Sequence, residues 1–474
     1  MFNSQQNGGG RMRRVLLLLV VTSAMLLPVQ ASEWAIAYGN ASNETAIDVI
    51  MDGNNYILFG DKYSGDFVLK IDSDGNVIWA TEFPHSSPYH LGKDIWKTSD
   101  GYISAAALNE SILLDRVREI NESCLEHTEF TILFNIYMEE ASVAVLNDGN
   151  YFVVGRTDSN RIWMGKMNSS GNLLSEKYYQ SNVTEINEVY PTSDGGAVIV
   201  GGYNITIGAA EVEYPMLIKV DSDLNIQMAK YYKYGITGFI QTYLCTAFES
   251  VQETSDGKFI TTVRCYEPLG NPMATMALID AQGNTEWVKA YLEENGEESM
   301  LYSAIEDNGN FVATGYVGSG TDKRVEMIKV DGSGNLTKAK SFKASNGYDE
   351  GRAIAKTTSY LIAGVTYLPN TKKDALLMKV DDELCISGCS YSGDVDASTL
   401  ELSSFGSGDV SYQSEQVPGY ILIISCWYAS PINLTKTVLC RSSPPQPIPE
   451  FSGIGLVMAL VSIALIVGWR VKRR

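Results

Sequence analysis

The chain has 474 residues, of which 36 are Lys or Arg and 56 are Asp or Glu, so its formal charge is −20. Residues 1–31 and 452–474 hold seven of the basic residues and none of the acidic ones, which leaves 29 basic against 56 acidic side chains between them. So acidic a body repels nucleic acid and anionic lipid surfaces, and we expect no nucleic-acid partner.

Residues 1–31 have the pattern of a secretion signal. Basic residues precede a short apolar run, and small residues suited to cleavage follow it. These parts are Arg11, Arg13 and Arg14, then 15–27, then 29–31. We predict a signal peptide with a helical core over 1–31 and an exported protein. The alternative is an uncleaved anchor helix, although the apolar run is short for a membrane span.

A four-strand pattern, clearest in residues 46–83, recurs along the chain. In that unit Asp52-Gly53 and Asp74-Gly75 are tight-turn signals, because Gly accepts a positive φ and Asp bonds its own backbone. The runs around them are nearly continuous in apolar residues, which suits strands covered on both faces. The first turn returns every 46 to 62 residues, at Asp100-Gly101, Asp148-Gly149, Asp194-Gly195, Asp256-Gly257, Asn308-Gly309 and, in degenerate form, Thr358-Ser359.

This period is typical of propeller blades, and we predict an all-β fold over 32–390, a seven-bladed β-propeller of four-stranded blades. The predicted blades are 46–83, 93–138, 141–179, 187–232, 248–291, 303–342 and 352–381. In the second, we expect residues 111–138 to hold a long loop or a short helix. A small residue recurs after the first turn, where we expect it to let neighbouring blades converge near the axis. These residues are Gly60, Ala107, Gly155, Gly201, Gly315 and Gly364.

Residues 33–39 look like a fourth strand that has no first three strands before it, and the last unit lacks a clear fourth strand. We predict that residues 33–39 complete the last blade, which leaves no open edge. The alternative is that residues 384–391 form that strand. Tight turns and long connections fall on opposite faces of such a body, and we expect any binding site on the long-loop face.

Past the repeats, residues 391–443 predict a small β appendage, and residues 444–452 predict a stiff Pro-rich stalk with a sorting motif. Residues 453–469 are apolar and predict a transmembrane helix, with a basic cytoplasmic tail over 470–474. We therefore expect the body outside the cell, at the surface, anchored to the cytoplasmic membrane by its C-terminus. The alternative for residues 453–469 is a buried core helix.

Pro449, Glu450 and Phe451, followed by an apolar helix and a terminal basic cluster, resemble the PEF-type sorting signal of archaeal surface proteins. The resemblance implies processing by an archaeosortase-like membrane enzyme, after which the mature protein would be lipid-linked. Separately, the repeats resemble tandem β-propeller repeats of secreted prokaryotic proteins, which implies a fold and no function.

Sequons and cysteines give the candidate modifications of an exported chain. The candidate glycosylation sites are Asn40, Asn43, Asn109, Asn121, Asn168, Asn182, Asn204, Asn335 and Asn433. The candidate disulfides are Cys385–Cys389, Cys426–Cys440 and Cys245–Cys265, which would leave Cys124 free. The alternative is that all seven cysteines are reduced and buried.

No motif predicts a catalytic residue, a cofactor or a metal. Residues 72–76 hint at a calcium loop, but the downstream Glu of such a loop is missing, so a hairpin turn is favoured. We interpret Trp79 and Trp287 as packing residues.

The histidines and the loop tyrosines also predict no catalytic or metal site. The three histidines fit no metal or triad spacing. They are His85, His90 and His127. A group of tyrosines in predicted loops could stack on sugars, although rim packing is the simpler interpretation. These are Tyr231, Tyr232, Tyr234 and Tyr243.

We predict a non-catalytic structural or recognition module that presents its loop face to a polysaccharide or another surface protein. The alternative is an extracellular enzyme acting on glycans, a hydrolase or a lyase. An enzyme should place two or more converging carboxylates of perturbed pKa in a pocket at the channel mouth, whereas a binding module should show a shallow aromatic or polar surface. Converging carboxylates would reverse the preference in favour of the enzyme.

Overall fold

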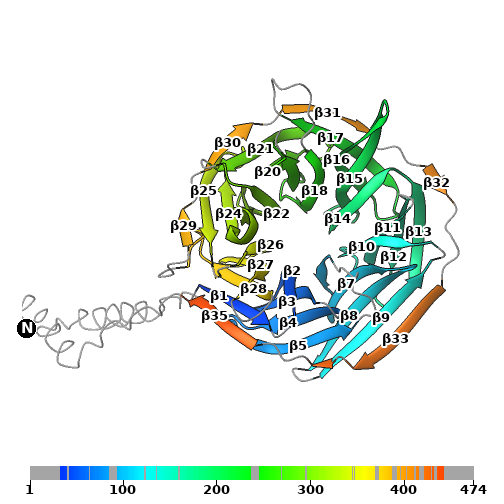
Figure 1. Cartoon of the computed structure of the whole chain (residues 1–474). Helices are drawn as coiled ribbons and strands as arrows, with labels where there is room; N and C mark the ends of the chain where they lie inside the picture. The colour runs from blue at the N-terminus through cyan, green and yellow to red at the C-terminus, as the bar shows by residue number, and fades with distance from the viewer. Residues whose placement is uncertain are drawn as a thin grey trace, which may run out of the picture. The chain divides into compact units, whose positions relative to one another are not determined.

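Tight turns divide the chain into short antiparallel strands in the computed structural model (Figure 1). In six of these turns the side chain of the first residue is a hydrogen-bond acceptor. Its Oδ1 atom accepts the backbone N–H groups of the residues two and four positions later. The acceptors are Asp72, Asn168, Asp221, Asp280, Asp331 and Asp381. In two copies that lack Gly, Leu224 and Leu384 take a φ of 64° and 59°. These side-chain bonds hold the turn even where the residue of positive φ is unfavourable.

The structure describes most of the chain from Glu33 to Arg441. The described residues are 33–39, 42–62, 65–84, 93–121, 124–134, 136–158, 161–235, 245–267, 270–293, 296–343, 345, 347–368, 373–386, 392–394, 397–401, 403–409, 413–415, 421–428, 430–431 and 435–441. The predicted signal segment, sorting motif, transmembrane helix and basic tail lie outside them. Within the described residues, no helix has the length and apolar character needed to cross a membrane.

The strands follow the repeats and fall into four positions within each unit. The first strands are β2 (Glu44–Asp52), β6 (Ile95–Lys97), β10 (Met138–Val145), β14 (Val183–Pro191), β18 (Cys245–Glu253), β22 (Ser299–Asp307) and β26 (Glu350–Lys356). The second strands are β3 (Asn55–Lys62), β7 (Gly101–Leu108), β11 (Tyr151–Thr157), β15 (Ala197–Ile207), β19 (Phe259–Tyr266), β23 (Asn310–Val317) and β27 (Tyr360–Thr366).

The other two positions complete each unit. The third strands are β4 (Gly65–Ile71), β8 (Ser111–Asn121), β12 (Arg161–Met167), β16 (Ala210–Val220), β20 (Pro272–Ile279), β24 (Arg324–Val330) and β28 (Asp374–Val380). The fourth strands are β5 (Val77–Pro84), β9 (Cys124–Leu133), β13 (Leu173–Gln180), β17 (Ile226–Gly235), β21 (Thr285–Glu293), β25 (Leu336–Phe342) and, for the last unit, β1 (Trp34–Gly39). Strands β8 and β9 form a hairpin where a long loop or helix was expected, so that prediction was wrong. A 3-10 turn, η1 (Gly320–Asp322), lies between β23 and β24.

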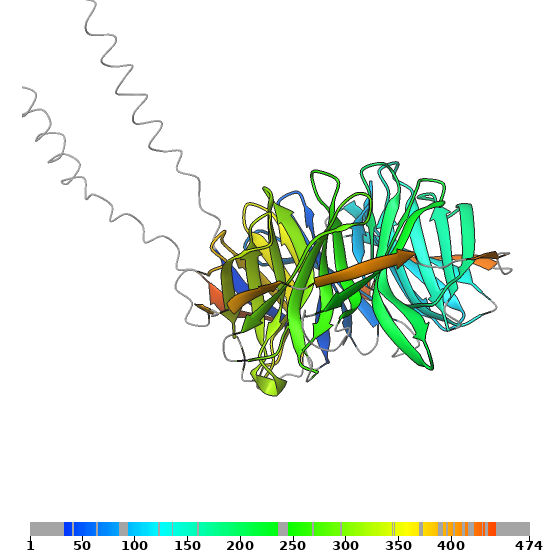
Figure 2. The same ribbon diagram turned by 90° about the horizontal axis from the view of Figure 1, so that it is seen from above.

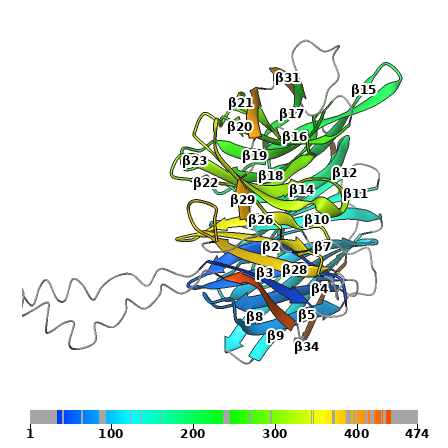
Figure 3. The ribbon, with the colours of Figure 1, turned by 60° about the vertical axis from the view of Figure 1, so that its left-hand side comes forward.

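Each unit is an antiparallel sheet, and the sheets stand side by side in a propeller-like ring with their first strands innermost (Figure 1). The units β14–β17 and β18–β21 are joined into one ten-stranded sheet through a single pairing of Gly202 with Ala247. Hairpin β15–β16 is the longest and projects beyond its neighbours (Figure 3). The prediction of an all-β fold built from repeated four-stranded antiparallel sheets is confirmed.

The segment predicted as a small appendage, 391–443, instead supplies one outer strand to every unit. These strands are β29 (Ser392–Asp394), β30 (Ala397–Glu401), β31 (Ser403–Asp409), β32 (Gln413–Glu415), β33 (Ile421–Tyr428), β34 (Ser430–Pro431) and β35 (Thr435–Arg441). In chain order they pair with β25, β21, β17, β13, β9, β5 and β1. The segment therefore runs backwards around the ring on its outer side (Figures 1 and 2). Its local pattern showed strands but not their partners.

Strand β1 closes the ring. It pairs with β28 on one side, from Trp34 opposite Lys379 to Tyr38 opposite Ala375, and with β35 on the other. The predicted role of residues 33–39 is confirmed, and residues 384–386, part of the alternative strand, lie in and just after a turn. All six residues of β1 are buried, because neighbouring sheets cover both of its faces.

The recurring small residues have two roles, of which only one was expected. A Cβ added to Gly60 would lie 2.2 Å from the carbonyl oxygen of Thr45, and one added to Gly364 would lie 1.9 Å from that of Glu350. Both carbonyls belong to the first strand of the same sheet, at a β-bulge. The bulge inside the sheet therefore requires Gly at Gly60 and Gly364. At Gly155 an added Cβ would instead lie 2.5 Å from the side chain of Ile112 in the neighbouring sheet, as expected for close approach of two sheets.

Neighbouring sheets are fastened by bonds from a fourth strand to the next turn. The hydroxyls of Tyr38, Tyr232 and Tyr291 donate to carbonyl oxygens of the following unit's last turn, at 2.9, 3.2 and 3.0 Å. Trp34 and Trp287 donate their indole N–H to the same kind of turn at 3.2 Å. These contacts agree with the interpretation of Trp287 as a packing residue. They add directed bonds to apolar cores that fill the space between sheets.

Removing residues 33–42 should leave β28 and β35 without a shared partner. We expect the midpoint of thermal unfolding, followed by circular dichroism, to fall by more than about 10 °C, because a buried strand and two ladders are lost. A chain that begins at Glu33 is the control. An unchanged midpoint in the shorter chain would contradict the role of β1.

Replacing Tyr291 with Phe removes one bond between sheets and keeps the ring. We expect the free energy of unfolding in urea to fall by about 1 kcal/mol, because the carbonyl of Gly334 loses a buried donor. The matched control is Tyr137→Phe at a side chain that is 46% exposed, for which we expect no measurable change. Equal effects of the two changes would refute the fastening role.

Candidate functional site

The inner strands carry β-bulges that turn one residue of each strand towards the centre of the ring. In β2, β14, β18, β22 and β26 the register skips a residue opposite the second strand, at Ile47, Asn187, Glu249, Tyr302 and Arg352. Strands β14 and β18 each skip a second residue nearer their start, Thr184 and Thr246, and these two are not part of this set of five. A bulge re-aims the side chain of its extra residue, and all five line one pocket.

The pocket has a volume of about 380 Å³, which lies within the range of small-molecule sites. It is lined mainly by residues inside the first strands. Thr45, Asp61, Lys93 and Asp94 extend the lining towards the long-loop face, where the sequence predicted a site. The residue after each bulge also faces it, and this position is acidic in Asp48 and Glu188. Asp94, just before β6, occupies the corresponding place in its unit.

Three of these carboxyl groups have raised pKa values. Burial raises the pKa of Asp48 to about 6, although N–H groups of Ile95 and Val49 bond the carboxylate. Burial raises the pKa of Asp94 to about 7, although the hydroxyl of Ser142 opposes the change. Burial and the neighbouring carboxylates of Asp94 and Asp48 raise the pKa of Glu188 well above its usual value. The three groups therefore interact and compete for protons.

Each of these acids also holds the next sheet. Asp48 Oδ2 accepts the backbone N–H of Ile95 at 3.0 Å, and Glu188 Oε2 accepts that of Val251 at 2.7 Å. Asp94 Oδ2 accepts the hydroxyl of Ser142. The carboxyl groups are thus fixed in position, with a structural role of their own.

The rest of the lining carries cations, an aromatic ring and further acids. The guanidinium of Arg352 lies 4.2 Å from the ring centre of Tyr302 and donates to Glu350. Lys93 lies 3.5 Å from Glu140 and donates to the carbonyl of Ile186. Both cations that line the pocket are therefore already bound to the protein's own groups.

Asp61 adds to the acidity of this lining. Burial and the nearby carboxylate of Asp66 raise the pKa of Asp61 to about 6, although Lys373 and Arg352 oppose the change. Across the part of the chain that the structure describes, no group of three or more His, Cys, Asp or Glu side chains is arranged to hold a metal ion. The arrangement is suited to acid–base chemistry. The pKa of Asp94 lies near 7, and that of its neighbour Asp48 lies lower, near 6.

Six predicted glycosylation sites have described side chains, and none of these six lines the pocket. Asn43, Asn109, Asn182 and Asn335 are exposed, whereas Asn168 and Asn204 are half-buried. Asn121 lies in β8, and Asn40 and Asn433 lie outside the described residues. The amide of Asn335 donates to Asp331 at 2.9 Å and its oxygen accepts Lys289 at 2.9 Å, which occupies this side chain within its turn. Glycosylation at the nine sites stays a prediction.

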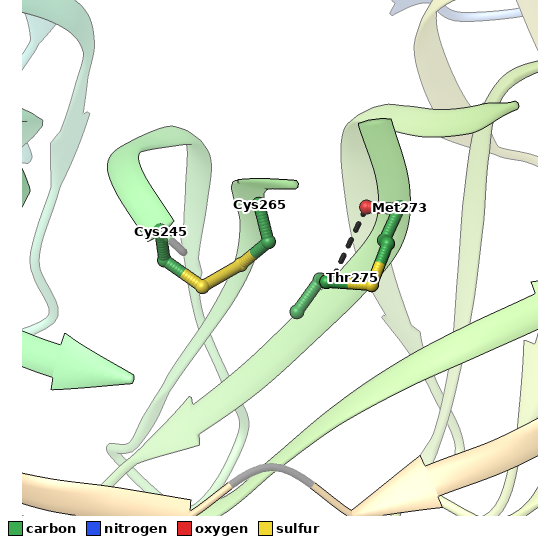
Figure 4. Close-up of a disulfide and its surroundings, with 4 residues drawn as sticks. All are labelled: Cys245, Cys265, Met273 and Thr275. Carbon is green, nitrogen blue, oxygen red and sulfur yellow. Dashed lines mark hydrogen bonds between the residues drawn. A yellow bond between two sulfur atoms is a disulfide. The ribbon is translucent and has the colours of Figure 1, made fainter. Parts of the chain in front are cut away.

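One predicted disulfide is formed. Cys245 and Cys265 face each other across β18 and β19 with their Cα atoms 4.0 Å apart (Figure 4). Cys385 carries a free thiol, and its predicted partner Cys389 lies outside the described residues, as does the side chain of Cys124.

The predicted Cys426–Cys440 pair does not fit the backbone. Cys426 lies opposite Thr128 in the β6–β9 sheet, and Cys440 lies opposite Ala35 beside β1. The β2–β5 sheet stands between these two sheets. A disulfide needs Cα atoms within about 7 Å, so this pairing was wrong. Both cysteines lie on strands, but nothing in the local sequence indicates which sheet each strand joins.

The predicted sugar-stacking tyrosines are packing residues. Tyr232 and Tyr234 are fully buried, and Tyr231 stacks on Tyr203 at 5.8 Å. Tyr243 lies outside the described residues. Rim and core packing, the simpler interpretation, therefore holds for the three that are described.

No histidine or tryptophan with a described side chain lines the pocket. His127 is buried with its Nε2 atom 2.8 Å from Asp115 and its ring 4.4 Å from that of Phe83. His85 and His90 lie outside the described residues. Trp79 is buried against Tyr102.

Sequence reasoning missed the pocket residues, although a signal was present. Each skipped residue precedes the first turn of its unit by five to seven positions, as Ile47 precedes Asp52 and Glu249 precedes Asp256. Polar side chains at that offset interrupt otherwise apolar first strands. The turns and apolar runs define the repeat, but they do not show that the residues at this offset face a common pocket.

Comparisons with known proteins give a fold likeness only. No family model matches the chain, and no curated protein matches it. Among solved structures, the polysaccharide lyase Uly1 is similar with a TM-score of 0.40 and 10% identity, over 71% of this chain and 90% of that one. The AfRom2 CNH domain is similar with a TM-score of 0.39 and 8% identity, over 72% and 96%. A hypothetical protein from Leishmania major has a TM-score of 0.24 and 14% identity, over 52% and 89%. Scores this low carry no argument about activity.

The buried acids predict a stability that falls as pH rises. Because their pKa values are raised in the folded state, folding favours protonation: the stabilisation is complete below about pH 4, the usual carboxyl pKa, and is lost as pH rises through about 6 to 7. We expect the free energy of unfolding in urea to drop by a few kcal/mol between pH 5 and pH 8. In Asp94→Asn the drop should be smaller, because the amide does not titrate. An equal slope in both proteins would contradict this assignment.

Proposed function

We propose that the chain is a seven-bladed β-propeller that is exported, anchored at the cell surface through its C-terminus, and active on glycans at its central pocket. Five separate sheets and the two halves of the ten-stranded sheet account for the blades. The secretion pattern of residues 1–31 and the tail pattern of residues 449–474 support export and anchoring. The Cys245–Cys265 disulfide agrees with an oxidising compartment.

One observation carries the choice of an enzyme: carboxyl groups of raised pKa converge in the pocket. This is the criterion that separates catalysis from passive recognition for this chain, and Asp48, Asp94 and Glu188 meet it. Glycoside hydrolysis needs one protonated and one ionised carboxyl group. Asp94 is suited to donate a proton near pH 7, and Asp48, with the lower pKa, is suited to act as the base or nucleophile.

Hydrolysis fits the pocket better than elimination. A lyase that acts on uronates has to neutralise the substrate's own carboxylate, for which a free cation is the direct means. Arg352 and Lys93, the cations among the described lining residues, are bound to Glu350 and Glu140. A neutral or amino sugar places no such demand on them.

A non-catalytic recognition or structural module is the second candidate. It is favoured by the bonds that Asp48 and Glu188 accept from the next sheet, since these give both acids a purpose without any reaction. In that case the same pocket would hold a sugar without changing it, and archaeosortase-like processing and a surface partner would be the relevant interactions.

Asp94→Asn separates the two candidates. We expect the unaltered protein to release reducing ends from neutral or amino-sugar polysaccharides in a panel that also contains uronate polymers. The variant should be at least about 100-fold slower, because it lacks the proton donor. Asp223→Asn, the same change at an exposed turn residue outside the pocket lining, should keep the activity. Ultraviolet absorbance of unsaturated products distinguishes elimination from hydrolysis.

Absence of any product from the unaltered protein, together with its retention on one of the immobilised polysaccharides, would refute the enzyme and favour the recognition module. Equal rates for both variants would show that Asp94 is not the donor.

A further inference from the structure

Two tyrosines form an aromatic platform on the pocket side of the ring. Tyr348 lies just before β26 and Tyr367 just after β27, so both belong to the connections of the long-loop face. Their ring centres are 5.9 Å apart and their planes are inclined by 36°. Tyr367 is 39% exposed, and Tyr348 is half-buried.

The platform is held from beneath by a buried carboxyl group. Asp349, fully buried, accepts the hydroxyl of Thr366 at 2.6 Å and the hydroxyl and N–H of Ser345 at 2.9 and 3.2 Å. These bonds tie the residue after Tyr348 to the residue before Tyr367. The two rings are therefore fixed before any ligand arrives, which lowers the entropic cost of binding.

Close packing between the two connections adds to this rigidity. A Cβ on Gly347 would lie 2.5 Å from Cβ of Tyr367, so Gly allows the connections to meet. The ammonium of Lys343 donates to Gly347 and, at 3.0 Å, to the carbonyl of Lys323. The backbone under Tyr348 is thus bound on both sides.

Lys373 joins the platform to the pocket. Its ammonium lies 5.4 Å from the ring centre of Tyr348. Its carbonyl oxygen accepts the backbone N–H of Glu44 at 2.9 Å, and the next residue, Thr45, lines the pocket. Lys373 is therefore bonded beside the pocket lining while its ammonium lies over Tyr348.

We propose that Tyr348 and Tyr367 form a subsite for a further sugar unit of the glycan whose reacting unit lies in the pocket; this rests on the proposed function. An aromatic face binds the C–H face of a pyranose by removing apolar surface from water. Rings whose hydroxyls are equatorial expose such a face, as in β-1,4-linked glucose and N-acetylglucosamine. Lys373 supplies hydrogen-bond donors to the hydroxyls at the ring edge.

Calorimetric titration with cellobiose, cellohexaose, chitobiose and chitohexaose tests the subsite on the full chain. We expect a hexasaccharide of one series to bind more tightly than its disaccharide. Tyr367→Ala should weaken that hexasaccharide about ten-fold and leave the disaccharide unchanged, and Tyr367→Phe should restore the affinity. The matched control is Tyr137→Ala, at an exposed tyrosine that makes no such pair in the described residues.

Unchanged hexasaccharide affinity in Tyr367→Ala would overturn the subsite, and so would failure of all four probes to bind the unaltered protein. The two proposals fail separately. Binding that depends on Tyr367, with no product from any polysaccharide, would keep the subsite and remove the enzyme. Cleavage without any effect of Tyr367 would keep the enzyme and remove the subsite. Because Tyr367 is exposed, its replacement should leave the unfolding midpoint unchanged, and this is measured alongside.

Discussion

The ring depends on the pairing of β1. A sheet edge with free N–H and C=O groups invites association with other chains, and a ring removes such edges only when its last unit is complete. Here Trp34–Gly39 is bonded on both sides, to β28 and to β35, so a strand from the start of the chain lies in the interior of the last sheet. The fully buried side chains of Trp34 and Tyr38 then join that sheet to the next one through Ser73 and Gly75.

The pocket arises from the same demand for pairing. At these bulges the ladder between first and second strands skips a residue, and in four of the five sheets a Gly on the second strand makes room for the displaced carbonyl. The skipped residues, among them Tyr302 and Arg352, then face the centre. The repeated bulge thus places a different side chain of each unit around the centre while the sheets stay the same. The skipped residues that line the pocket are therefore distinct from the residues that stabilise the sheets.

The turns and apolar runs predicted the sheets because they report local structure: an Asp that bonds its own backbone and a residue of positive φ suffice to end a strand. Strands β29–β35 show where this reasoning stops. Their partners, such as Thr128 for Cys426, are far away in the chain, and no local feature identifies them. The acids of the pocket were not predicted for a related reason. Asp48 and Asp94 belong to different units, and only the packing of neighbouring sheets brings them together and removes the water that keeps their pKa values low.

The backward course of the outer strands bears on how the chain is assembled. Trp34 emerges first from the ribosome, yet its partners Lys379 and Arg441 are more than 300 residues later. The units between can form from neighbours in sequence, whereas the last one needs both ends of the chain at once. Contacts so distant in sequence slow folding, since a long loop must close before they are made. The last sheet can therefore be completed only after Arg441 has been synthesised, when the other units have had time to form.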